Sequence, residues 1–438
     1  MKHCRHFSFG NAYSRPVVCA VLLGLVLLGT SGLSVAASGD LDPTFGIGGR
    51  VSTDVSNGAD NLQQIRLDSK QRILALSNHA VYNSSGALIC YATNVVIRYA
   101  PYGALDTSLN QTGKLPLNNC SVSGGFSIDG ILPVADGKFI VIGEKDGGTS
   151  NGKPSASSFN VPFTAVRYNE DGSVDSSFTK ISGGFLSPYA GQTVGDIRTD
   201  AQGRILISGS TWLKAYNGYN ISVPAVARYL ANGKADSSFG NDSHNPGKMV
   251  LKQYNDQKYS YLALYHRMIV RSDGTIAIVG YMPLQSNGTN DWSKGGVLRL
   301  AANGAVIPYQ TADGILPVDV GYHLNLTAAS AFEDATRNLV LMSSDSSFLS
   351  SRSFSIVTRA INADTGAASE TFVAPSAATL AQMSSDCFNG MCSTSVSSGD
   401  AGVVLPDSVG RFLYGGHTGD LNKWWDATIN IVVYRILP

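Results

Sequence analysis

The sequence predicts an all-β protein, a six-bladed β-propeller with four-stranded blades, closed by an N-terminal strand that pairs with the C-terminal blade. Three observations predict this fold. A tight turn followed by an apolar strand recurs six times, a second strand phrase lies between successive copies, and the last repeat lacks an outer strand that the N-terminal segment can supply. Repeats that each provide four short strands are typical of propellers, whose blades close into a ring.

Residues 1–37 have the features of a secretory signal peptide. Three cations and no acid are present, an apolar run spans 17–28, and Val35 and Ala37 have the spacing of a cleavage site. This run is too short to cross a bilayer. We therefore expect a mature chain that begins near Ser38 and is periplasmic or secreted. No later stretch has the roughly 20 apolar residues of a membrane span.

The composition is typical of an exported, turn-rich β protein. Without the leader, 29 basic and 32 acidic residues remain, a net charge of about −3, which gives no reason to expect nucleic-acid binding. Glycine is abundant, with 47 residues, and only 15% of residues are charged. No cofactor is expected, and we expect a monomer.

The first recurring phrase is a tight turn followed by a strand that ends in Gly or Ser. Its copies are "DSKQRILALS" from Asp68, "VADGKFIVIG" from Val134, "DAQGRILISG" from Asp200, "RSDGTIAIVG" from Arg271, "DATRNLVLMS" from Asp334 and "DSVGRFLYGG" from Asp407. The anchor residues of these turns are Arg72, Lys138, Arg204, Thr275, Asn338 and Arg411. Their steps of 66, 66, 71, 63 and 73 residues set the period of the repeat.

The second phrase completes each period as four strands, A to D. Examples are "VVIRYAPYGALDTSL" from Val95 and "TAVRYNEDGSVDSSF" from Thr164, in which strand C precedes a Gly-containing hairpin and strand D. The predicted blades are 61–118, 127–186, 193–252, 264–319 and 328–374, with the inner strands of blade 6 in 400–438 and its outer strand in 44–54. The segment "GDLDPTFGIGGRV", residues 39–51, is the turn and outer strand that blade 6 lacks, so its pairing closes the ring.

The phrases "LDPTFG", "LDTSL", "VDSSF" and "ADSSF" resemble the delta-60 repeat family of exported bacterial propeller-like proteins. The resemblance covers nearly all of the mature chain and is degenerate at "AVIPYQ" and "TGAASETF", where the Asp and Phe are lost. It implies the fold and export. It implies no activity, catalytic residue or cofactor.

Strand C carries an arginine in every blade, which indicates a packing rule rather than a site. These residues are Arg98, Arg167, Arg228, Arg299, Arg359 and Arg435. Asp106, Asp175 and Asp236 each follow their arginine by eight residues, so we expect an ion pair that locks the C-to-D hairpin. Arg435 is expected to pair with Asp42, whereas blades 4 and 5 lack this Asp.

The two faces of the predicted ring differ. The A-to-B and C-to-D turns of one face are tight, whereas the other face carries long connections that we expect to be irregular, and long loops on a rigid scaffold often bind ligands. The predicted ligand-binding residues lie there: Trp212, Tyr216, Tyr219, Trp292, Trp424 and Trp425, with Tyr82 nearby. Such aromatics among Asn, Ser and Gly suit sugar rings or a protein partner. Their other interpretation is that they seal gaps between loops.

Four cysteines remain after removal of the leader, and their even number in an oxidising compartment indicates two disulfides. We expect Cys90 to pair with Cys120 and Cys387 with Cys392, although the sequence allows three pairings. The first bridge would restrain the long-loop face.

The starts of the A strands place polar side chains at the mouth of the channel, where propeller enzymes hold metals and acid–base pairs. Weak catalytic candidates are Asp129, Asp196, His266 and Arg267, with Gln63, Gln64 and Asp400 at related positions. Their other interpretation is a set of solvated strand ends, and their spacing matches no metal-ligand motif. No metal site is predicted.

The sequence thus favours an exported binding scaffold that recognises a glycan or a protein partner at the cell envelope through its long-loop face. Two alternatives stay open: an enzyme with a polar site at the channel mouth, and a structural or adhesive surface module.

Overall fold

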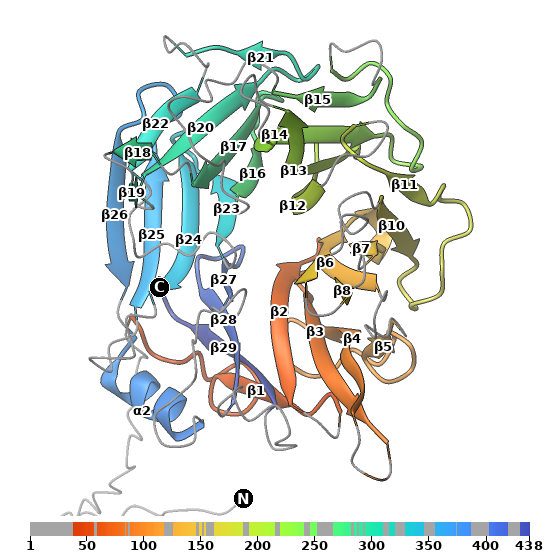
Figure 1. Ribbon diagram of the computed structural model, residues 1–438. Coiled ribbons are helices and arrows are strands. Elements are labelled where there is room, and N and C mark those ends of the chain that lie inside the picture. The colour runs from red at the N-terminus through yellow and green to blue at the C-terminus, as the bar shows by residue number, and fades with distance from the viewer. Residues whose placement is uncertain are drawn as a thin grey trace, which may run out of the picture. The chain divides into compact units, whose positions relative to one another are not determined.

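Six antiparallel sheets follow one another around a central axis in the computed structural model (Figure 1), which confirms the predicted six-bladed β-propeller. The residues that the structure describes are 38–56, 59–83, 85, 88–117, 126–145, 149–150, 153–154, 162–186, 192–214, 220–240, 246–251, 266–281, 284–286, 289–291, 294–309, 315–319, 329–345, 355–373, 375–386, 403–418 and 430–438.

Each blade runs from an inner strand at the axis to an outer strand at the rim. Blade 1 consists of β2 (Asp60–Leu67), β3 (Ile73–Tyr82), β4 (Leu88–Tyr99) and β5 (Lys114–Pro116). Blade 2 consists of β6 (Phe126–Pro133), β7 (Phe139–Lys145), β10 (Phe163–Tyr168) and β11 (Ile181–Gly183), with η1 (Ala135–Gly137) in its first turn. Blade 3 consists of β12 (Gln192–Thr199), β13 (Ile205–Lys214), β14 (Asn220–Tyr229) and β15 (Lys248–Val250).

The second half of the ring follows the same plan. Blade 4 consists of β16 (His266–Val270), β17 (Ile276–Tyr281), β20 (Lys294–Leu300) and β21 (Val306–Ile307), and a further strand, β22 (Ile315–Asp319), also pairs with β20. Blade 5 consists of β23 (Ser330–Glu333), β24 (Leu339–Asp345), β25 (Ser355–Ile361) and β26 (Ala368–Val373). Blade 6 consists of β27 (Val403–Pro406), β28 (Phe412–His417), β29 (Ile431–Ile436) and β1 (Arg50–Thr53).

The hydrophobic core is divided among the junctions between blades. Each of the six buried clusters joins residues of two neighbouring blades. Between blades 2 and 3, for example, Phe163, Ile142 and Ile207 are fully buried. Because burying one such side chain stabilises the fold by about 1.5–3 kcal/mol, blade-to-blade packing is a major source of stability.

The N-terminal strand closes the ring, as predicted. Strand β1 pairs with β29 from Arg50↔Tyr434 to Thr53↔Ile431, and the backbone N–H of Asp42 donates to the carbonyl of Arg435 at 2.8 Å. The strand is shorter than the predicted 44–54 because the preceding residues form turns. Gly46 has a φ of +53°, and a Cβ there would lie 2.1 Å from the carbonyl oxygen of Arg50, so this turn requires glycine.

The A-to-B turns of blades 1, 3, 5 and 6 begin with an aspartate that caps the turn. In blade 3 the Asp200 Oδ1 atom accepts from the N–H of Gln202 at 3.0 Å and of Arg204 at 2.9 Å, while Oδ2 pairs with the Arg204 Nε at 2.6 Å. Asp68 with Arg72 and Asp407 with Arg411 repeat this arrangement. The phrase Asp-x-x-x-Arg therefore fixes the turn by capping its backbone.

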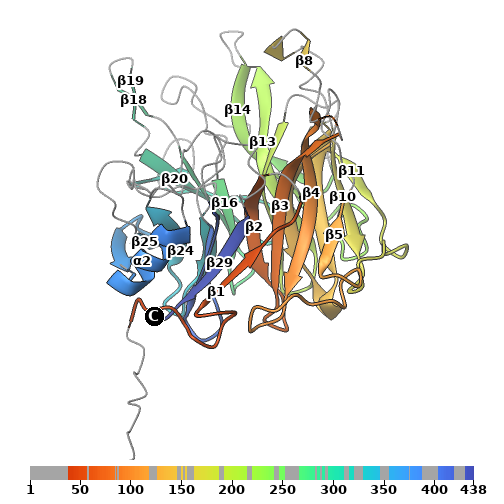
Figure 2. The same cartoon turned by 90° about the horizontal axis from the view of Figure 1, so that it is seen from below.

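The long-loop face is more regular than expected. The connections of blades 1 and 3 were expected to be irregular, but β3–β4 stays paired to Tyr82↔Leu88 and β13–β14 to Lys214↔Asn220. These hairpins extend the blade strands because their apolar and β-branched residues continue the strand pattern. Figure 2 shows β13–β14 projecting at the same face as the small hairpins β8 (Thr149–Ser150) with β9 (Lys153–Pro154) and β18 (Leu284–Ser286) with β19 (Thr289–Asp291). The helix α2 (Ala377–Asp386) was not predicted.

Asp60 begins the inner strand of blade 1 and is fully buried. Burial raises its pKa to about 6, despite hydrogen bonds from the Val55 N–H and the Ser56 hydroxyl. A folded pKa above the unfolded value of about 3.9 means that ionisation of Asp60 destabilises the fold increasingly from pH 4 to pH 6 and constantly above that.

We therefore expect Asp60→Asn to increase the free energy of unfolding at pH 7 by about 1–3 kcal/mol and to have little effect at pH 4. An amide can still accept from Val55 and donate to Ser56. Urea unfolding at pH 4, 5 and 7 measures the effect, with Asp54→Asn as the control for removing a neighbouring exposed charge. A difference from wild type that does not vary with pH would contradict the prediction.

Candidate functional site

The predicted channel-mouth residues lie on inner strands but in different surroundings. Asp129 on β6 is exposed, whereas Asp196 on β12 and Arg267 on β16 are buried, with 4% and 8% of their surface exposed. His266 begins β16, but its side chain lies outside the described residues, as does all of Asp400. The structure therefore assigns contacts to only part of this candidate site.

Asp196 joins blade 3 to blade 4. Its Oδ2 atom accepts from the backbone N–H of Met268 at 3.1 Å and from Nη2 of Arg198 at 2.9 Å. Burial acts to raise the pKa of Asp196, but the charges of Arg198, Arg267 and Arg66 and the hydrogen bond from Met268 lower it overall. A carboxyl that stays ionised at neutral pH is poorly suited to act as a general acid or base there.

The repeat position of Asp196 also forms a hydrogen bond to the backbone of the next blade in blades 1 and 5. It lies eight residues before the turn anchor and is occupied by Gln64, Asp196 and Ser330 in blades 1, 3 and 5. Gln64 accepts from the N–H of Ile131 at 2.8 Å, and the Ser330 hydroxyl donates to the carbonyl of Val404. The polar inner-strand residues thus have a structural use, joining neighbouring blades near the axis.

Arg267 spans three blades. Its Nε donates to the carbonyl of Ala329 in blade 5 at 2.8 Å, and its Nη1 donates to the carbonyl of Gly195 in blade 3 at 2.9 Å. Both contacts are to backbone oxygens, so this guanidinium supports the inner ring of strands.

Sequence reasoning missed two further arginines beside Asp196. Arg66 and Arg198 both lie two residues before the aspartate that opens an A-to-B turn, a spacing that is visible in the sequence. Arg66 Nη2 is 3.6 Å from Asp196 Oδ1, although these residues belong to blades 1 and 3. Burial and the nearby Arg198 and Arg267 lower the pKa of Arg66 to about 9, against the opposing effect of Asp196. One carboxylate is thus surrounded by three guanidinium groups.

The strand-C arginines form inter-blade contacts on the tight-turn face. In blades 1, 2, 3 and 6 the arginine Nε donates to an aspartate, which lies eight residues later in blades 1 to 3 and is Asp42 of the N-terminal segment in blade 6. The distance is 2.8 Å for Arg98–Asp106, Arg167–Asp175 and Arg228–Asp236, and 2.9 Å for Arg435–Asp42. This confirms the predicted ion pairs. Their Nη1 atoms donate to a backbone carbonyl of the next blade, on Glu170, Ala231, Ala302 and Pro101 respectively. We call this arrangement the clasp, and it joins neighbouring blades as well as locking a hairpin.

Blade 4 has no complete clasp. Ile307 stands eight residues after Arg299, where the clasps of blades 1 to 3 have aspartate. The Arg299 Nη1 instead binds Asp364 of blade 5, whose side chain is 74% exposed, while the guanidinium lies 4.0 Å from the centre of the Tyr309 ring. The Nε of Arg299 is buried and forms no hydrogen bond within the part of the chain that the structure describes.

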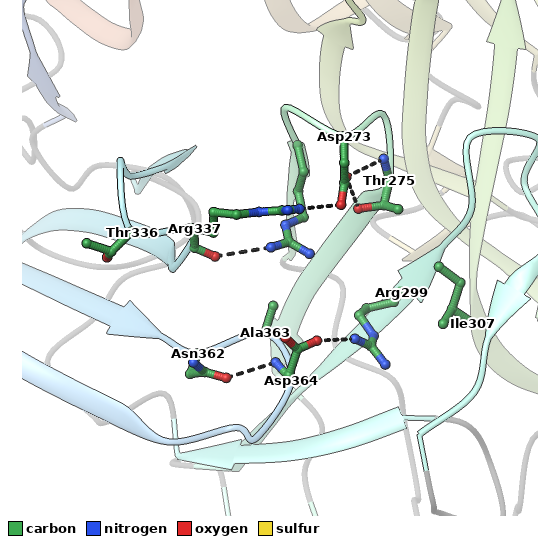
Figure 3. Close-up of a pocket in the computed structure, with 10 residues that line it drawn as sticks. Asp273, Thr275, Arg299, Ile307, Thr336, Arg337, Asn362, Ala363 and Asp364 are labelled. Carbon is green, nitrogen blue, oxygen red and sulfur yellow. Dashed lines mark hydrogen bonds and ion pairs between the residues drawn. The ribbon is translucent and has the colours of Figure 1, made fainter.

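A pocket of about 410 Å³ opens at this junction of blades 4 and 5, within the usual range of about 300–1,000 Å³ for small-ligand sites. Figure 3 shows Arg337 and Asp273 on one side of it and Arg299 and Asp364 on the other. Burial acts to raise the pKa of Asp273, but hydrogen bonds from Thr275 and Arg337 and the charge of Arg271 lower it to about 2. The pocket therefore presents ionised groups of both signs at neutral pH.

A second pocket, of about 440 Å³, lies between blades 2 and 3. Lys138 and Arg167 line it, and both bind the Asp175 carboxylate at 2.8 Å. Here the clasp is complete, so the cations of this pocket already have an anionic partner.

Most aromatic candidates of the long-loop face fall outside the described residues. Trp212 is described: it is partly buried on β13 and pairs in register with Ser222 on β14. The residues that lie outside, or whose side chains do, are Tyr82, Tyr216, Tyr219, Trp292, Trp424 and Trp425. Their role in binding stays a prediction.

The cysteine predictions also remain untested. Cys90 lies on β4, but its side chain is outside the described part of the structure, as are Cys120, Cys387 and Cys392.

In the part of the chain that the structure describes, no three His, Cys, Asp or Glu side chains gather where they could bind a metal ion. None of the described helices has the length and apolar character of a membrane span.

Comparison with family models finds a match in blades 2 and 3. The model of the domain of unknown function DUF5122 beta-propeller matches residues 163–178 and 203–239, in blades 2 and 3. No curated protein matches the sequence.

Several solved structures are similar to this chain at low identity. A protein of unknown function from Dyadobacter fermentans is 11% identical, with a TM-score of 0.46 over 89% of this chain and all of the other. The polysaccharide lyase Uly1 is 11% identical, with a TM-score of 0.46 over 86% of this chain and 78% of the lyase. A Trypanosoma rangeli sialidase mutant is 8% identical, with a TM-score of 0.47 over 91% of this chain and 60% of the sialidase. The family match in blades 2 and 3 agrees with the six-bladed β-propeller that the strand pairings form.

Proposed function

We propose that this protein is an exported binding scaffold that recognises a glycan or a protein partner at the cell envelope through its long-loop face. The observation that carries the proposal is the β13–β14 hairpin of blade 3, which stays paired as far as Lys214↔Asn220 and presents the partly exposed Trp212 on that face. A tryptophan on a paired strand offers a flat apolar surface at low entropic cost, which suits a binding surface.

The tight-turn face supports a binding site on the long-loop face, because its own turns are bonded to neighbouring blades. The clasp arginines hold each turn to the next blade, for example Arg98 to the carbonyl of Glu170 at 2.7 Å. A rigid base beneath extended hairpins is the usual design of loop-based recognition.

Cleavage of the predicted signal peptide is compatible with closure of the ring. The N–H of Gly39 donates to the carbonyl of Leu437 at 3.0 Å, so the ring needs residues from Gly39 onward. Cleavage before Ser38 would leave this contact intact.

The test is binding of the mature protein to an array of bacterial cell-surface polysaccharides, followed by titration of any glycan that binds. We expect Trp212→Ala to weaken binding at least tenfold without changing the melting temperature, because a stacking aromatic is removed from a surface hairpin. The matched control is Tyr102→Ala, which removes an aromatic that is 61% exposed in a tight turn of blade 1, on the opposite face.

Equal losses in Trp212→Ala and Tyr102→Ala would contradict a site on the long-loop face. Unchanged binding in both variants would exclude Trp212 from the site. If no glycan binds, the protein-partner form of the proposal is tested by cross-linking on intact envelopes with the same two variants.

A further inference from the structure

The pocket between blades 4 and 5 lies where four other junctions hold a carboxylate. At those junctions the strand-C arginine donates from Nε to an aspartate of its own blade, as Arg228 does to Asp236 at 2.8 Å. In blade 4 the equivalent residue is Ile307, and none of the described residues forms a hydrogen bond with the Nε of Arg299. Blade 4 therefore retains the cation of the clasp but lacks its anion.

The turn anchor of blade 4 also differs from that of other blades, and this difference leaves more room in the pocket. The turn anchor of blades 1, 2 and 6 is a cation that also reaches the clasp carboxylate: Arg72 to Asp106 at 3.1 Å, Lys138 to Asp175 at 2.8 Å and Arg411 to Asp42 at 3.0 Å. The anchor of blade 4 is Thr275, which is too short to fill this position. Thr275, Ile307 and Arg299 all line the pocket.

The remaining wall of the pocket is polar. Arg337 binds Asp273 across one side (Figure 3), and Thr336 and Asn362 contribute a hydroxyl and an amide. The backbone of Arg337 has a φ of 68°, at a turn position that is glycine in blades 2, 3, 4 and 6. A side chain kept at such a position costs conformational energy, and here it places a guanidinium at the pocket.

We propose that this pocket binds a small polyhydroxylated carboxylate, such as a sugar acid, whose carboxylate pairs with the guanidinium of Arg299, the clasp arginine that lacks an aspartate in its own blade. Guanidinium groups favour carboxylates because their N–H groups match the two oxygens. The hydroxyls of the ligand face Asp273, Thr336 and Asn362, which can accept or donate hydrogen bonds. The volume of about 410 Å³ suits a monosaccharide-sized ligand rather than acetate alone.

Asp364 is the internal competitor for Arg299. Its carboxylate is 74% exposed, so it can leave Arg299 and remain solvated when a ligand binds. Asp364→Asn is therefore expected to strengthen ligand binding about threefold to tenfold.

The test uses the mature protein with glucuronate, glucose, acetate and inorganic phosphate as probes, measured by calorimetry and ligand-observed NMR. We expect glucuronate to bind at least tenfold more tightly than glucose or acetate. Arg299→Gln should abolish this preference for glucuronate over glucose. Ile307→Asp should also abolish it, because its carboxylate restores the clasp in place of the ligand, whereas Ile307→Asn should retain glucuronate binding.

The pocket between blades 2 and 3 provides a matched control, since Arg167 already holds Asp175. Arg167→Gln should leave glucuronate binding unchanged. Glucose binding as tightly as glucuronate, phosphate binding in its place, or full binding by Ile307→Asp would each overturn the proposal. Thermal unfolding of every variant shows that it is folded, and Ile307→Asp introduces a contact that four blades already contain.

This site lies on the tight-turn face, so it stands apart from the proposed long-loop site. Trp212→Ala should leave glucuronate binding unchanged, and Arg299→Gln should leave polysaccharide binding unchanged. The two proposals can therefore fail independently.

Discussion

Removal of residues 38–53 is expected to abolish the cooperative unfolding transition of the ring. This segment supplies β1, the Asp42 carboxylate that Arg435 and Arg411 bind at 2.9 and 3.0 Å, and Phe45, which is fully buried between blades 6 and 1. Losing a buried phenylalanine costs about 3–5 kcal/mol, and leaving a buried cation unpaired costs about 3–5 kcal/mol. These losses approach a typical total stability of about 5–15 kcal/mol.

Circular dichroism melting and size-exclusion chromatography measure the outcome. A synthetic peptide of residues 38–56, added to the truncated chain, should restore part of the melting transition by pairing with β29. A peptide that carries Asp42→Asn and Phe45→Ala should not. A truncated chain that melts at the temperature of the full mature chain would show that closure by β1 contributes little.

The periodic features of the fold could be predicted from the sequence because the residues that form them recur at the same positions in successive repeats. The recurring turn phrase predicted the tight A-to-B turns, and the Arg of strand C with its Asp predicted an ion pair. The capping of the turns by aspartate became visible only in the structure. Closure followed from a count of strands, since "LDPTFG" supplies what the last repeat lacks.

Features that depend on which blades meet at the axis could not be predicted. Arg66 and Asp196 lie 130 positions apart in different blades, and only the closed ring brings their side chains to 3.6 Å. The extended hairpins were missed because Gly, Ser and Asn dominate parts of the β3–β4 and β13–β14 connections, and these residues usually indicate loops.

The pocket between blades 4 and 5 depends on one feature that is visible in the sequence and on others that are not. The degenerate phrase "AVIPYQ" shows that the clasp aspartate is lost, but the resulting cavity also depends on Thr275 and on the turn of blade 5 that carries Asn362 and Asp364. The lost motif marks the blade in which the clasp is incomplete, but the sequence does not show that a cavity forms there.

The clasps predict that Arg228→Gln lowers the free energy of unfolding much more than Arg299→Gln does. Arg228 is buried, and it binds Asp236 at 2.8 Å and Ser238 at 3.2 Å. Replacing it leaves a carboxylate that is 8% exposed without its main cation, and we expect the free energy of unfolding to fall by about 3–5 kcal/mol. Arg299 has the same place in the repeat but pairs with the exposed Asp364, so Arg299→Gln should cost less than about 1 kcal/mol.

Urea unfolding at pH 7 measures both variants under the same conditions. Burial acts to raise the pKa of Asp236, but Ser238 and Arg228 lower it overall, so its stabilising contribution is present above the unfolded pKa of about 3.9 and is lost as the pH falls through the lower folded pKa. The difference between Arg228→Gln and wild type should therefore shrink below pH 4. Adding Asp236→Asn to Arg228→Gln should recover part of the loss, because the unpaired buried charge is removed. Equal costs for the two arginines would mean that the clasp contributes no more than an exposed ion pair, and that blade packing alone holds the ring together.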